Sequence, residues 1–152
     1  MFLQKTNFAI QESEEHLEKS GNKGSAIESF LTQHILILLC AEMQQEIYKI
    51  VEQRLSSNSD QRIIRFGLVA SQKLLRSVKK EEIAGYLCYF GDDLKDGFKN
   101  AFTDQEVAIY NNAVNSRIDV AHRHGAVISF DDIKQAFMVA EKILLEVEKS
   151  LG

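Results

Sequence analysis

The feature that most restricts the fold of this chain is the complete absence of proline from its 152 residues. Average usage of about 5% would give roughly seven or eight prolines in a chain of this length. Proline interrupts helix interiors, because it lacks the backbone N–H and its ring clashes with the preceding turn. The sequence therefore predicts an all-α fold. Its length and its 45% hydrophobic content are typical of one globular domain spanning residues 1–152.

Apolar residues recur at helical spacing along most of the chain. Serine and threonine residues suited to cap a helix precede several segments, and Ser25 and Thr103 have a glutamate three residues later that would complete a capping box. The predicted architecture is an up-and-down bundle of four long helices plus short extra helices. The helices are expected over about residues 3–20, 25–55, 61–77, 83–90, 93–100, 103–124 and 129–150.

The second helix is expected to be the central one, because residues 35–40 are apolar on every side. Two polar residues, His34 and Glu42, interrupt its apolar stripe. His34 is interpreted as a core histidine whose hydrogen bonds are satisfied. A carboxylate on an apolar face needs a partner. Glu42 therefore either pairs with a basic residue of the motif described below, or faces solvent, or accepts a hydrogen bond in the core.

The charge of the chain is unevenly distributed. Its net charge of −4 argues against a general nucleic-acid-binding surface, so any RNA contact must come from a local basic patch. Residues 61–80 form the most basic window, but Glu81 and Glu82 follow directly. The window is interpreted as a solvated helix face, with an RNA-tracking surface as the alternative.

Cysteine usage and hydropathy predict a cytoplasmic protein. Cys40 and Cys88 lie in apolar helical contexts without metal-ligand spacing, as expected for core residues in a reducing compartment. The first residues lack the apolar run of a signal peptide, and residues 35–40 are far too short to span a bilayer. The sequence contains no recognisable Gly-rich phosphate loop, metal-binding pair or catalytic triad. We therefore expect no cofactor, no metal and no membrane partner.

The residues with the greatest chemical potential lie between Arg117 and His124, in the sequence Arg-Ile-Asp-Val-Ala-His-Arg-His. An arginine neutralises a phosphate with a planar fork of donors, and a histidine transfers protons near neutral pH. Together they suffice to cleave a phosphodiester without a metal. Arg117 and His122 are the candidate catalytic residues, with Asp119, Glu42 and His124 in supporting roles. A simpler explanation is that these basic residues stabilise the C-terminal end of a helix dipole.

Helix geometry places these groups unevenly. Arg117 and His124 fall within about 20° of one another around the helix and roughly 10 Å apart along it. Arg117 and His122 differ by about 140°. Either the end of the helix near Gly125 reorients the histidine, or a second subunit supplies the missing half. Asp119 lies one turn before His122, and either orients its imidazole or pairs with a neighbouring arginine on the surface.

Arg117 is followed by four residues and then by His122 near the end of a helix, and one further amphipathic helix comes after it. This arrangement resembles the signature of the HEPN domain superfamily. The nearest form is the bacterial branch of RiboL-PSP and MAE-type HEPN proteins, in which the motif commonly ends in Ala-His. Over residues 25–150 the resemblance is a pattern of helices, with an internal carboxylate, Glu42 or Glu46, in the long central helix. The sequence departs from the family at Ile118, where a polar residue usually follows the arginine.

The resemblance implies a helical bundle that forms a homodimer, with two motifs facing one cleft. It also implies a metal-independent endoribonuclease of the kind found in toxin–antitoxin, anti-phage defence and RNA-processing systems, with RNA as substrate and an antitoxin or defence component as a candidate partner. On this hypothesis the ribose 2′-hydroxyl attacks the adjacent phosphate, with His122 as acid–base and Arg117 binding the phosphate. Ile118 and the acidic net charge favour the alternative, a non-catalytic HEPN-like dimerisation or protein-binding module. The third hypothesis is a helical bundle unrelated to this family.

Overall fold

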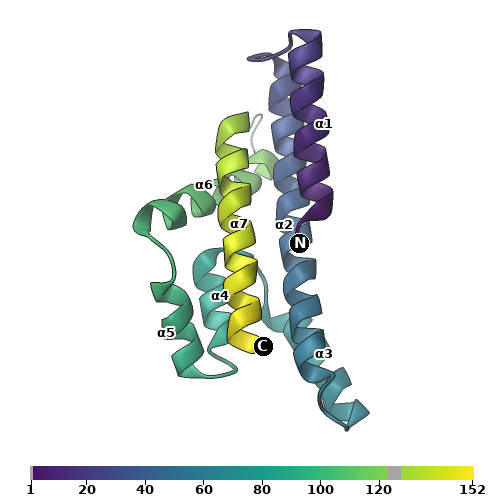
Figure 1. The fold of residues 1–152 in the computed structure, drawn as a ribbon, viewed down its shortest axis with the longest axis vertical. Coiled ribbons are helices and arrows are strands. Elements are labelled where there is room, and N and C mark those ends of the chain that lie inside the picture. Colours follow the sequence, from purple (N-terminus) through teal and green to yellow (C-terminus); the bar gives the residue numbers. More distant parts are fainter. Residues whose placement is uncertain (1, 123–127) are drawn as a thin grey trace.

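The computed structural model describes the backbone of residues 2–122 and 128–152 and the side chains of residues 2–117 and 128–152. Within this part of the chain every regular element is an α-helix, as the sequence predicts (Figure 1). The helices are α1 (Gln4–Ser20), α2 (Ala26–Leu55), α3 (Gln61–Leu74), α4 (Lys80–Leu87), α5 (Asp92–Asn100), α6 (Asp104–His122) and α7 (Phe130–Leu151).

Several helix boundaries follow the predicted caps, whereas α4 begins and ends three residues earlier than predicted and two further features differ. Ser25 caps α2, because its hydroxyl accepts a hydrogen bond from the first turn. Glu28 does not complete the predicted capping box, since its carboxylate accepts the backbone N–H of Gly24 instead. Helix α3 ends at Leu74, three residues earlier than predicted, because the backbone of Leu75 leaves the helical conformation (φ −84°, ψ 92°). The start of α3 and the start of α7 lie where the sequence places them.

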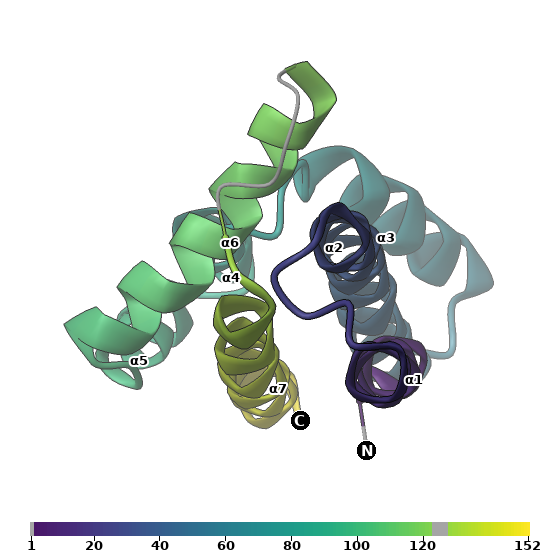
Figure 2. The same ribbon diagram turned by 90° about the horizontal axis from the view of Figure 1, so that it is seen from above.

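Helix α2 is the centre of the molecule, as predicted, and packs against α1, α3, α6 and α7. Figures 1 and 2 show α1 alongside the N-terminal half of α2, with α7 and α6 on other sides of it. By length and mean hydropathy α2 meets the criterion for a membrane-spanning helix, which the core helix of a bundle also meets. Its buried line consists of Ile35, Leu36, Leu39, Cys40, Met43, Ile47, Ile50 and Val51.

One side of the N-terminal half of α2 is uncovered, contrary to the expectation that residues 35–40 are buried on every side. Ile37 is 46% exposed and Phe30 is 68% exposed. His34 also faces solvent, so its interpretation as a core histidine is wrong. The reason is that the helices packed on this half of α2 bury the opposite side. We call Ile27, Phe30 and Ile37 the α2 apolar face, since they fall within about 80° of one another around the helix.

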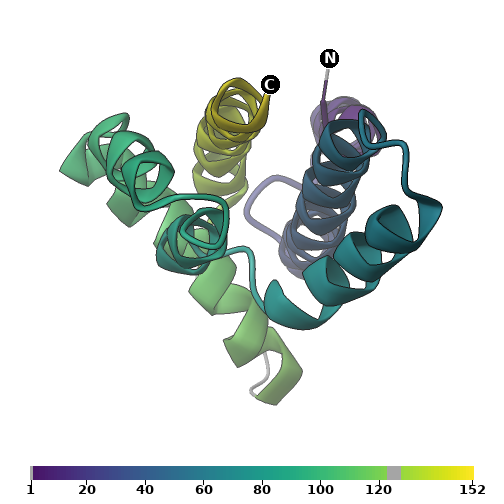
Figure 3. The ribbon, with the colours of Figure 1, turned by 90° about the horizontal axis from the view of Figure 1, so that it is seen from below.

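Helix α3 lies at the edge of the molecule and packs mainly against the C-terminal half of α2 (Figure 3). Gly67 packs directly against α2, where an added Cβ would lie 2.6 Å from Cδ1 of Leu55. Ser71 is the one residue of α3 that is buried, and it accepts a hydrogen bond from the Tyr86 hydroxyl of α4 at 2.7 Å. Helix α3 is therefore supported on one side and exposed on the other.

Candidate functional site

Helix α6 carries the predicted motif, and its N-terminal half is firmly anchored. Thr103 and Glu106 form the capping box that the sequence predicts: the Thr103 N–H donates to Glu106 Oε2 at 2.8 Å, and the Glu106 N–H donates to Thr103 Oγ1 at 3.2 Å. Tyr110 is completely buried, and its hydroxyl donates to the Val78 carbonyl at 2.6 Å. Burial raises the pKa of Tyr110 well above its usual value. These contacts fix the direction and the rotation of α6.

Arg117 continues the inward-facing line of α6. It falls within about 20° of Tyr110 around the helix axis, on the side where Ala113 and Val114 are buried. Arg117 is nevertheless exposed, because α6 extends beyond the body of the bundle toward its C-terminal end (Figure 2). The side chain therefore lies where the inward side of α6 emerges from the core into solvent.

The neighbour of Arg117 on α2 is Cys40. Burial raises the pKa of the Cys40 thiol to about 11, and the positive charge of the nearby Arg117 guanidinium opposes this rise. A thiol is a weak acceptor, and a guanidinium carries five N–H donors. Because its side chain is also exposed, the Arg117 guanidinium is accessible to an anion in solvent.

Glu42 has its partner elsewhere. Its carboxylate is buried and caps the start of α1, accepting the Lys5 N–H at 3.0 Å, the Thr6 N–H at 2.8 Å and the Thr6 hydroxyl at 2.7 Å. Cys40 and Glu42 are two residues apart, which places them about 160° apart around α2. Glu42 and the guanidinium beside Cys40 thus occupy opposite sides of the central helix and do not meet within one protomer.

The other predicted site residues lie largely outside the described part of the chain. Helix α6 reaches His122, so Arg117 and His122 belong to one continuous helix. The side chains of Asp119 and His122 are outside the described side chains, and His124 is outside the described residues altogether. The site that the structure describes is therefore its arginine half.

Two polar residues that sequence reasoning did not single out help to hold this half in place. Asn111 of α6 accepts the Lys80 N–H at 3.2 Å and donates to Glu81 Oε2 at 3.0 Å, which ties α4 to α6. Gln44 of α2 donates from Nε2 to the Leu75 carbonyl at 3.2 Å, which ties the end of α3 to α2. Both contacts join positions about thirty residues apart, so no local pattern could have indicated them.

No protein-family model, curated protein or solved structure matches this chain. Among the described residues, no group of three or more His, Cys, Asp and Glu side chains is arranged to hold a metal ion.

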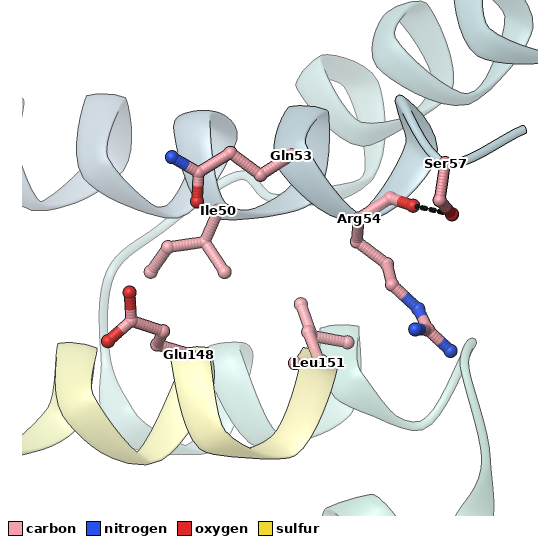
Figure 4. Close-up of a pocket in the computed structure, with 7 residues that line it drawn as sticks. Ile50, Gln53, Arg54, Ser57, Glu148 and Leu151 are labelled. Atoms are coloured by element: carbon pink, nitrogen blue, oxygen red, sulfur yellow. Dashed lines mark hydrogen bonds between the residues drawn. The ribbon is translucent and has the colours of Figure 1, made fainter.

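Two cavities lie away from Arg117. One of about 220 Å³ lies between the C-terminal ends of α2 and α7, where Figure 4 shows Ile50 and Leu151 facing each other beside Gln53, Arg54 and Glu148. It begins ten residues beyond Cys40, or roughly 15 Å along α2. The second, of about 260 Å³, opens beside Glu42 and is lined mainly by polar side chains of α2 and by Lys5. Neither cavity includes Arg117.

Proposed function

We propose that this protein is a homodimeric, metal-independent endoribonuclease of the HEPN type that acts in the cytoplasm. The observation that carries the proposal is the position of Arg117: it is exposed on the inward side of α6, and its guanidinium lies near Cys40 of α2. An exposed guanidinium beside a helix junction is suited to bind a phosphate through two parallel hydrogen bonds. The all-helical architecture is consistent with a HEPN-like bundle.

In the proposed reaction His122 accepts the proton of a ribose 2′-hydroxyl, and the 2′-oxygen forms a bond to the adjacent phosphorus. Arg117 stabilises the additional negative charge that develops on the phosphate oxygens. The bond from phosphorus to the 5′-oxygen then breaks, and a histidine returns a proton to that oxygen. The products are a 2′,3′-cyclic phosphate and a 5′-hydroxyl. Asp119 and His124 are the proposed supporting residues.

A second protomer would complete the site, because Arg117 and His122 are separated by about 140° around one helix. The α2 apolar face is the proposed contact. Ile37 lies one turn before Cys40 on α2, and exposed clusters of large apolar side chains mark protein–protein interfaces. A dimer built on this face would bring a second α6 toward the first Arg117. Glu42, which is bound to α1, is proposed only as a residue that stabilises the fold.

The second candidate function is a non-catalytic HEPN-like module that dimerises or binds a protein partner such as an antitoxin. The same α2 apolar face favours it, because Phe30 and Ile37 are suited to a protein partner whether or not RNA is cleaved. Ile118 also favours it, since it replaces a polar residue of the family pattern.

Cleavage of a single-stranded RNA oligonucleotide in excess chelator tests the proposed function. We expect cleavage to proceed without a divalent metal and to leave a 2′,3′-cyclic phosphate end, detectable by mass spectrometry. The same sequence with 2′-O-methyl groups should remain intact, because it has no nucleophile. Cleavage of both oligonucleotides, or of neither, would refute the proposed chemistry, and intact RNA with a stable dimer would favour the non-catalytic module.

Replacing both Phe30 and Ile37 by glutamate is expected to convert the protein from a dimer to a monomer. The substitutions place two carboxylates on each side of a symmetric contact, where they repel one another and the apolar contact is lost. Light scattering coupled to gel filtration at micromolar concentration measures the mass. Phe8→Glu is the matched control, because Phe8 is 63% exposed on α1 and outside the α2 apolar face. A wild-type monomer, or a dimer that survives both substitutions, would contradict the proposed interface.

A further inference from the structure

We propose that the outward side of α3 binds the backbone and one base of single-stranded RNA and leads it to Arg117. This side, the α3 basic face, consists of Arg62, Arg65, Phe66 and Lys73. The inference builds on the proposed function, because its ligand is the substrate of that reaction. It concerns binding, however, and can be tested without any cleavage.

The charged side chains within α3 and the segment that follows it are all basic. Residues 61–80 hold six of the 18 basic residues of the chain and none of its 22 acidic residues. The ion pairs formed among the described residues involve none of the cations of α3. Glu81, which follows this window in sequence, is directed to α6, where it accepts the side-chain amide of Asn111. The cations of α3 are therefore free to bind an external anion.

The cations and one aromatic ring share the outward side of the helix. Gly67 and Ser71 define the side that faces α2 and α4. Arg62 and Lys73 lie about 160° and 140° from the middle of that side, and Arg65 and Phe66 lie within about 80° of both. Phe66 is 76% exposed, and Arg62, Arg65 and Lys73 are all exposed. An exposed ring among cations is the arrangement that proteins use to hold single-stranded nucleic acid, with the base stacked and the phosphates paired.

The C-terminal end of α3 and Arg117 lie against neighbouring turns of α2. Gln44 holds the Leu75 carbonyl at the end of α3, and Cys40, the neighbour of Arg117, is four residues before Gln44 on the same helix. These two positions are about 6 Å apart along α2 and about 40° apart around it. Arg76, which is exposed directly after Leu75, extends the run of basic residues beyond the end of α3.

The test measures binding of a fluorescein-labelled, 2′-O-methyl single-stranded 20-mer by anisotropy at several salt concentrations, because this oligonucleotide cannot be cleaved by 2′-hydroxyl attack. We expect the triple variant Arg62→Gln, Arg65→Gln, Lys73→Gln to bind roughly 10- to 50-fold more weakly at 0.15 M salt and to lower the slope of log affinity against log salt by about 2, which corresponds to three lost phosphate contacts. Phe66→Ala should weaken binding about 5-fold or more with an unchanged slope, because stacking is not ionic.

The matched controls separate these effects from net charge and exposed aromatic area. Lys19→Gln, Lys23→Gln, Lys149→Gln removes three cations that are exposed and already paired with glutamates. Phe8→Ala removes an aromatic ring that is similarly exposed on α1. Both controls should bind within about 2-fold of the wild type. Circular dichroism confirms that each variant is folded.

The outcomes are distinct. Selective loss in the α3 variants supports the proposal even if unmodified RNA is never cleaved, in which case only the nuclease proposal fails. Equal weakening by the triple variant and its lysine control would overturn it, since net charge alone would explain the binding. Absence of RNA binding by the wild type would also overturn it. Binding of α3 to vesicles containing phosphatidylserine in place of RNA would have the same consequence.

Discussion

Replacing Arg117 by alanine is expected to lower kcat/KM for RNA cleavage by about 10²- to 10³-fold, while the protein remains folded. The size of the effect follows from the role of the side chain, because removal of one preorganised donor to a developing oxyanion costs this much in other enzymes. Folding should change little, since Arg117 is exposed and its described contact is the weak acceptor Cys40. Single-turnover cleavage in excess chelator, together with a thermal melt, measures both.

Two companion variants identify the cause of this loss. Arg117→Lys retains the charge but loses the planar fork, so it should recover only part of the rate. Arg54→Ala removes an exposed arginine near the C-terminal end of the same central helix α2, beside the cavity shown in Figure 4. It should leave the rate within about 2-fold. If Arg117→Ala cleaved RNA at the wild-type rate, Arg117 would have no role in the reaction. Its charge would then serve only to stabilise the C-terminal end of the helix dipole.

Replacing Glu42 by alanine is expected to reduce the free energy of unfolding by about 2–3 kcal/mol. Three donors of α1 lose their acceptor at once, and each buried group left unsatisfied costs roughly 1–3 kcal/mol. The total should stay near the lower end of that sum, because the cavity of about 260 Å³ beside Glu42 has room for water to hydrate the exposed N–H groups. Urea denaturation measures the change as a shift in midpoint at constant slope.

The controls for Glu42 separate the cap from the loss of a carboxylate. Glu52→Ala, an exposed glutamate on the same helix, should change stability by less than about 0.5 kcal/mol. Thr6→Val removes one of the three donors to Glu42 and should cost about 1 kcal/mol. Equal stability of the Glu42→Ala and Glu52→Ala variants would show that the cap does not stabilise α1.

The helices of this protein are predictable from its sequence because their signals are local. The Thr103–Glu106 capping box and the polar stretch before α3 each act within one or two turns. The absence of proline likewise leaves each helix interior uninterrupted. The fold class, the central position of α2 and the start of α6 therefore agree with the structure. The end of α3 was predicted three residues too late because Leu75 leaves the helix although its apolar side chain fits the helical pattern.

The relations between helices were not predictable in the same way. Ile37 lies in a run that is apolar on every side, and nothing in the run indicates which side other helices leave open. The partner of Glu42 proved to be the N–H groups at the start of α1, which carry no side-chain signature in sequence. Likewise the proximity of Arg117 to Cys40 depends on how α6 crosses α2. Periodicity predicts a buried stripe but not its neighbour.

The opposed placement of Cys40 and Glu42 has a mechanical consequence. A single turn of α2 supports the start of α1 on one side and the guanidinium of Arg117 on the other. Close-packed interiors transmit displacements, so a ligand that displaced α1 and thereby shifted this turn of α2 would also move Cys40 relative to α6. The N-terminal helix is thus linked to the geometry of Arg117 through α2.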